Sequence, residues 1–68
     1  MFVANVDLSR YSVEDYLKIR DKIYGEAFIC KEIPGSCRGI QVTWDQSRSL
    51  ADFAGIDPEC IHLVAGSM

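Results

Sequence analysis

Two segments of the sequence alternate apolar and polar side chains, and this alternation constrains the fold more than any other feature. The segments are Phe2–Leu8, FVANVDL, and Ile40–Asp45, IQVTWD. A period of two is expected of a strand that lays one face on a core and turns the other toward solvent. The sequence therefore predicts two strands, each with one buried face.

A helix is predicted between these strands, from Val13 to about Tyr24. Ser12 precedes it as N-cap, and Asp15 follows three residues later in a variant of the capping box. Gly25 can adopt the left-handed conformation that ends a helix. We expect the helix to pack on the core through one apolar stripe, which consists of Val13, Tyr16, Leu17, Ile23 and Tyr24, with Ile19 at its margin.

The segment between this helix and the second alternating strand is predicted to be a strand and a turn. Residues 26–33, EAFICKEI, are short and partly apolar, and the pattern does not fix which side faces the core. In the following PGSCRG, Pro34 cannot donate to a ladder and Gly35 permits a positive φ. These features predict a hairpin connection between two neighbouring strands.

The stretch 47–66 admits two interpretations. In both, Ser47 or Ser49 caps a short helix that ends at Gly55 and carries an apolar face made of Leu50, Phe53 and Ala54. The interpretations differ in the element after Gly55, which is either a second helix or a last strand. The function expected of the chain depends on this choice.

In the first interpretation, residues 50–65 form a helix-turn-helix. Pro58 stands at the first helical position and Asp57 before it as N-cap. The spacing resembles the helix-turn-helix of phage-repressor-like proteins at Leu50, Ala51, Ala54, Gly55, Ile56, Ile61 and Val64. This resemblance implies a DNA-binding regulator. The face that should read bases, however, offers Asp57, Glu59, Cys60 and His62, without the arginine or asparagine that most often contacts bases.

In the second interpretation, residues 60–65, CIHLVA, form a last strand after an Ile-Asp-Pro-Glu loop. Ile61, Leu63 and Ala65 then share one face, and Cys60, His62 and Val64 share the other. The element order becomes strand, helix, strand, strand, helix, strand, which is the ferredoxin-like βαββαβ arrangement. Its two central strands would be the two segments that alternate most cleanly, and this agreement favours the second interpretation.

The ferredoxin-like arrangement places both helices on one face of an antiparallel sheet. The side chains expected to be buried there, or their facing neighbours, are Phe2, Val6, Leu17, Ile40, Trp44 and Phe53. The opposite face would carry Asn5, Asp7, Gln41 and Thr43. This face is polar but carries little charge, so we expect that it, or an exposed edge strand, binds a partner.

Length and charge narrow the classes of function. The 68 residues allow a single domain, 1–68, and the ten acidic and seven basic residues give a net charge of −3. Binding to phosphate is dominated by Lys and Arg, so nucleic acid is not expected as a partner. The sequence shows neither a secretory signal nor an apolar run long enough for a membrane span, which predicts a cytoplasmic protein.

Cysteine and histidine suggest a metal site only weakly. Cys30, Cys37, Cys60 and His62 are suitable ligand types for a Cys/His metal-binding module, but they lack paired C-x₂-C spacing. Cysteine catalysis needs a nearby base, and His62 is the only histidine. We therefore predict no enzyme activity, no cofactor and no metal, and regard the metal-binding module as a second alternative.

These observations favour a small acidic protein-interaction module that regulates or inhibits a larger protein. Stand-alone acidic domains of this length include virus-encoded inhibitors of host defence machinery such as nucleases, an analogy of size and charge only. A homodimer through an edge strand is a further expectation. The residues predicted to contact the partner are Asn5, Asp7, Gln41, Thr43, Asp45, Asp57 and Glu59.

Overall fold

Four antiparallel strands form one sheet, in the spatial order β2-β3-β1-β4. The computed structural model describes residues 1–66, and the last two residues of the predicted domain 1–68 lie outside the described residues. The elements in chain order are β1 (Phe2–Asp7), α1 (Val13–Tyr24), β2 (Ile29–Glu32), β3 (Gly39–Trp44), α2 (Leu50–Ala54), a 3₁₀ turn η1 (Pro58–Cys60) and β4 (Ile61–Gly66). The two cleanly alternating segments are the central strands, as predicted.

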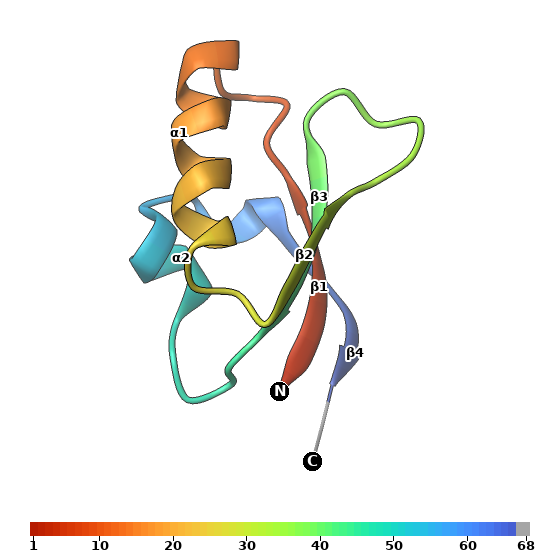
Figure 1. The fold of residues 1–68 in the computed structure, drawn as a ribbon, viewed down its shortest axis with the longest axis vertical. Helices are drawn as coiled ribbons and strands as arrows, with labels where there is room; N and C mark the ends of the chain where they lie inside the picture. The colour runs from red at the N-terminus through yellow and green to blue at the C-terminus, as the bar shows by residue number, and fades with distance from the viewer. Residues whose placement is uncertain (67–68) are drawn as a thin grey trace.

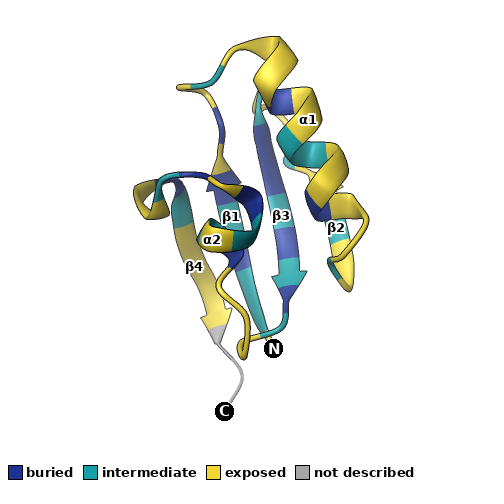
Figure 2. Cartoon of the chain, turned by 90° about the vertical axis from the view of Figure 1, so that its left-hand side faces the viewer, coloured by how far each residue is buried: buried dark blue, intermediate teal, exposed yellow. Residues whose placement is uncertain are grey.

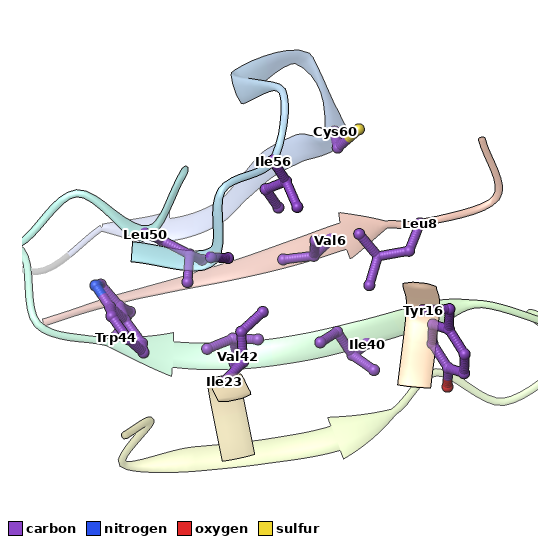
Figure 3. Close-up of a cluster of buried hydrophobic side chains, with 11 residues drawn as sticks. Val6, Leu8, Tyr16, Ile23, Ile40, Val42, Trp44, Leu50, Ile56 and Cys60 are labelled. Carbon is purple, nitrogen blue, oxygen red and sulfur yellow. The ribbon is translucent and has the colours of Figure 1, made fainter. Parts of the chain in front are cut away.

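Both helices lie on the same side of the sheet, and no helix lies on the other side in residues 1–66 (Figure 1). The core fills the space between the sheet and the helices, and Trp44, Leu8 and Ile23 are among its largest fully buried side chains (Figure 3). The central strands contribute a large share of this core, because β1 and β3 turn alternate apolar residues toward the helices. Apart from Gly39 at the start of β3, the strand residues that face the opposite side are half-buried or exposed (Figure 2).

The first helix begins as predicted and buries a narrower stripe than predicted. Ser12 caps it, since the Ser12 hydroxyl accepts a hydrogen bond from the Asp15 amide at 3.1 Å. Tyr16 and Ile23 are buried, whereas Leu17, together with Val13 and Tyr24, is exposed. The expected burial of Leu17 is therefore wrong. The sheet contacts only the line of positions that runs through Tyr16 and Ile23, which lie about two helical turns apart.

Two local expectations around β2 also need correction. Gly25 is right-handed, with φ −70°, so it does not supply the left-handed ending that was predicted. The chain keeps turning beyond it, because the Glu26 and Ala27 amides both donate to the Ile23 carbonyl. This extended turn explains why β2 starts at Ile29 rather than at residue 26. Gly35, with φ +82°, takes the positive φ expected of the hairpin.

The stretch 47–66 forms a helix and a strand. Ser49 caps α2, and Gly55 ends it in the left-handed conformation with φ +70°. Asp57 then caps the three-residue η1, after which β4 runs antiparallel to β1. The second helix required by the helix-turn-helix interpretation of residues 50–65 is therefore not formed. One turn after Pro58 the chain becomes extended.

Two predicted side-chain orientations in the last strand are wrong. Cys60 belongs to η1 and is buried in the core, while His62 lies opposite Asn5 on the other side of the sheet, so the two do not share a face. A bulge between Val3 and Ala4 in the β1–β4 register places Ala65 opposite Val3. Opposed residues of an antiparallel pair share a face. Ala65 therefore lies on the face opposite to that of Ile61 and Leu63.

Candidate functional site

The candidate site is the face of the sheet that the helices leave uncovered, called here the open face. Its centre is Asn5, which lies between Gln41 of β3 and His62 of β4. The Gln41 side-chain amide donates a hydrogen bond of 3.2 Å to the Asn5 side-chain oxygen. Thr43 lies one pair further along β3, opposite Val3. A half-buried patch thus crosses the central strands on the open face. It consists of Val3, Asn5, Gln41 and Thr43.

Asp7 occupies the end of the open face where β1 stops. It lies opposite Gly39, and its carboxylate accepts a hydrogen bond of 3.0 Å from the Ser9 amide. Hydrogen bonds from Ser9 lower the pKa of Asp7 below its usual value. The carboxylate is therefore ionised at neutral pH, and it gives one end of the open face a negative charge.

Asp45 lies at the opposite end of the central strands from Asp7, directly after β3. Its carboxylate accepts hydrogen bonds from the Ser47 amide at 2.9 Å and from the Ser47 hydroxyl at 2.8 Å. These bonds lower the pKa of Asp45. Because one carboxylate oxygen already stabilises the turn into α2, Asp45 has a structural role that the sequence prediction did not include.

Asp57 and Glu59 lie in η1 and its cap, away from the Asn5–Gln41 pair. The Arg10 guanidinium contacts the Asp57 carboxylate at 2.8 Å and that of Glu59 at 3.8 Å. The Asp57 carboxylate also accepts a hydrogen bond from the Glu59 amide, which is the main reason that its pKa is lowered. These two acids are therefore not a free acidic patch. Their contacts with Arg10 link the segment between α2 and β4 to the segment between β1 and α1.

The structure thus brings together only part of the predicted partner-binding set. Asn5, Gln41 and Thr43 are contiguous, Asp7 flanks them, and the remaining acids belong to separate turns. The open face also contains residues that were not predicted as contacts from the sequence, namely Val3, Ile29, Lys31, His62 and Ala65. Their place on the open face follows from the pairing register of the strands. For example, Ile29 lies opposite Thr43, and Lys31 lies opposite Gln41.

A second group of side chains combines basic and aromatic residues on the helical side of the sheet. Arg48 lies over the rings of Trp44 and Phe53, at 5.1 and 5.0 Å from their centroids. Lys22 lies 5.2 Å from the centroid of Phe53. Cations at these distances from a ring are attracted by its negative face. These contacts join α1, α2 and the end of β3. The group of basic and aromatic side chains is therefore explained by the packing of these three elements.

The cysteines and the histidine do not converge. Cys30 lies on β2 and His62 on β4, at opposite edges of the sheet, while Cys60 is buried in the core. Burial raises the pKa of the Cys30 thiol to about 11. Within residues 1–66, no three His, Cys, Asp or Glu side chains come together in a way that suits a metal ion. The structure therefore offers no observation in favour of the metal-binding alternative.

Comparison of the chain with models of known protein families, with curated proteins and with solved structures finds no match in any of the three. Among the described residues, neither helix has the length and apolar character needed to cross a membrane.

Proposed function

We propose that this chain is a small protein-interaction domain of ferredoxin-like arrangement, which regulates or inhibits a larger protein docked on its open face. The strand order β2-β3-β1-β4, with a helix after β1 and another after β3, supports the ferredoxin-like arrangement. The observation that carries the functional proposal is the open face itself. It is a continuous patch across all four strands, covered by no other element of residues 1–66.

The side chains of the open face suit a protein surface better than a charged polymer. Its centre offers the neutral donors and acceptors of Asn5, Gln41 and Thr43, and Ile29, 60% exposed, adds an apolar contact beside them. Interfaces between proteins use both hydrogen-bonding groups and apolar contacts, so this mixture of side chains suits a protein partner. The single base Lys31 is a poor match for a polyanion, since phosphate binding requires several basic groups.

The net charge of −3 favours a partner whose surface is basic. A nuclease is a partner of this kind, because its nucleic-acid groove must attract phosphate. The negative charge of the chain therefore supports a role as an inhibitor of such an enzyme. The proposal assigns no catalytic step, cofactor or metal to the chain itself.

The test is quantitative capture followed by a binding measurement. The full chain is immobilised and incubated with a lysate of cells that express the chain. A partner that is retained in stoichiometric amount is then purified. Thr43→Arg places a bulky charge at the centre of the open face, and Val13→Arg makes the same change on α1, where Val13 is 55% exposed. We expect Thr43→Arg to weaken binding at least about tenfold, as central interface residues do, and Val13→Arg to leave it unchanged.

The proposal is wrong if no stoichiometric partner is retained. It is equally wrong if Val13→Arg weakens binding as much as Thr43→Arg does, since the partner would then contact the helical side. Circular dichroism of both variants establishes that each has kept its fold before binding is compared.

A further inference from the structure

We propose that β4 is the surface through which two copies of this chain associate, by antiparallel pairing of β4 with β4 of a second copy. β4 is an edge strand, so one side of its backbone has no strand neighbour within residues 1–66. The unpaired amides and carbonyls of an edge are a template for a further strand. This inference goes beyond the proposed function and does not depend on any other partner.

The two edges of the sheet differ in how well they are protected against such pairing. β2 has only four residues, carries the charges of Lys31 and Glu32, and is followed closely by Pro34. Short length, charge and proline are the features that keep edge strands from pairing. β4, IHLVAG, has six residues and contains neither an acid, nor a lysine or arginine, nor a proline. Its one protective feature is the bulge opposite Val3 and Ala4.

Two large apolar side chains of β4, Leu63 and Val64, are exposed. Leu63 lies opposite Ala4 and therefore on the helical side of the sheet, yet it is 68% exposed, the highest value among the large hydrophobic residues that the structure describes. Val64 is 52% exposed. In Figure 2, β4 is half-buried only at its start, and the strand beyond it is exposed. A strand added along this edge would cover apolar area that the chain leaves in water.

Charge favours a second copy as the added strand. An uncharged strand that pairs with itself brings no like charges together, although the whole chain has a net charge of −3. The acids closest to β4 in sequence are Asp57 and Glu59, and both are engaged by Arg10. A 68-residue domain also has a small core, and association is a common way of adding to its stability.

The pairing determines how the two copies are arranged. Opposed side chains of antiparallel neighbours lie on the same face of a sheet. The two open faces would therefore lie on one side of a continuous sheet, and all the helices on the other. Because only one strand of each copy takes part, the interface is at the small end of the range for protein association. We expect a dissociation constant in the range of roughly ten micromolar to one millimolar.

Sedimentation equilibrium of the full chain tests the inference, from about ten micromolar to one millimolar. A reducing buffer prevents the exposed Cys37 from linking copies. We expect the average mass to rise from 7.6 kDa toward twice that value. Leu63→Lys should weaken the association at least about tenfold, because a lysine on the edge strand opposes pairing. Ile29→Lys, the matched change on the exposed side of β2, should associate as the unmodified chain does.

A constant mass of 7.6 kDa at every concentration would overturn the inference. So would association that Leu63→Lys leaves intact, or that Ile29→Lys abolishes. If Leu63→Lys does not fold, a mixture of isotope-labelled and unlabelled unmodified chain decides the question. Intermolecular nuclear Overhauser effects between β4 protons support the pairing, and their absence, or effects confined to other elements, contradicts it.

Discussion

Gly55 and Gly25 follow the two helices, but only Gly55 has a left-handed backbone. Its φ is +70°, whereas Gly25 has φ −70°. A side chain in the left-handed region costs roughly 1–2 kcal/mol, while an alanine in the right-handed region restricts only the unfolded chain. At Gly25, an added Cβ would meet the Lys22 and Asp21 carbonyls at 3.6 and 3.7 Å, which is ordinary contact. The two positions therefore form a matched pair for substitution.

We predict that Gly55→Ala lowers the free energy of unfolding by about 1–2 kcal/mol. Gly25→Ala should leave it unchanged or raise it by up to about 1 kcal/mol. Urea denaturation of both variants at pH 7, followed by circular dichroism, measures the difference. Equal destabilisation by the two substitutions would show that Gly55 does not need its left-handed conformation.

At the scale of an element, α1 contacts the sheet through Tyr16 and Ile23 rather than through the whole apolar stripe. Ile23 is fully buried, whereas Leu17 is 40% exposed. Truncation of a fully buried isoleucine to alanine costs about 2–5 kcal/mol, part of it from the cavity left behind. Truncation of a side chain that is only partly covered, such as Leu17, costs less. The apolar pattern of the sequence treats Leu17 and Ile23 as equal. Their different exposure predicts that truncation destabilises the protein to a different extent at the two positions.

We predict that Ile23→Ala lowers the free energy of unfolding by about 2–5 kcal/mol, which is a large part of the stability of a domain this small. Leu17→Ala should cost less than about 1 kcal/mol. Equilibrium unfolding in urea, with Trp44 fluorescence as the probe, measures both. A larger loss for Leu17→Ala would place the helix in a different rotation on the sheet.

Element boundaries that depend on local chemistry were predictable from the sequence. The starts of α1 and α2 follow from N-caps, since Ser12 and Ser49 each accept a hydrogen bond from the amide three residues on. For α2 the sequence allowed either Ser47 or Ser49 as the cap. The start of β2 was not predictable, because it depends on two amides that converge on the Ile23 carbonyl. The bulge that turns Ala65 to the open face also left no signal in the sequence, since no residue there has the positive φ that would favour glycine.

At the scale of the whole molecule, the candidate site was predictable where it depended on alternation alone. Asn5 and Gln41 were placed on the open face by the period of two within their own strands, and the register makes them direct neighbours. Lys31 and His62 were missed because their edge strands lack a clear pattern. Asp57 was expected to contact a partner, but its contact with Arg10 joins segments far apart in the chain. Long-range pairs of this kind become visible only in the fold.

The extended conformation of β4 beside β1 is the feature of the whole molecule on which both proposals depend. Strand β4 completes the open face, supplies the unprotected edge and replaces the second helix of a helix-turn-helix. Backbone chemical shifts of Ile61–Gly66, together with cross-strand nuclear Overhauser effects between Asn5 and His62, test it directly. We predict shifts typical of a strand and a close Asn5–His62 pair. Helical shifts in this segment, without that pair, would contradict both the fold and the protein-interaction proposal.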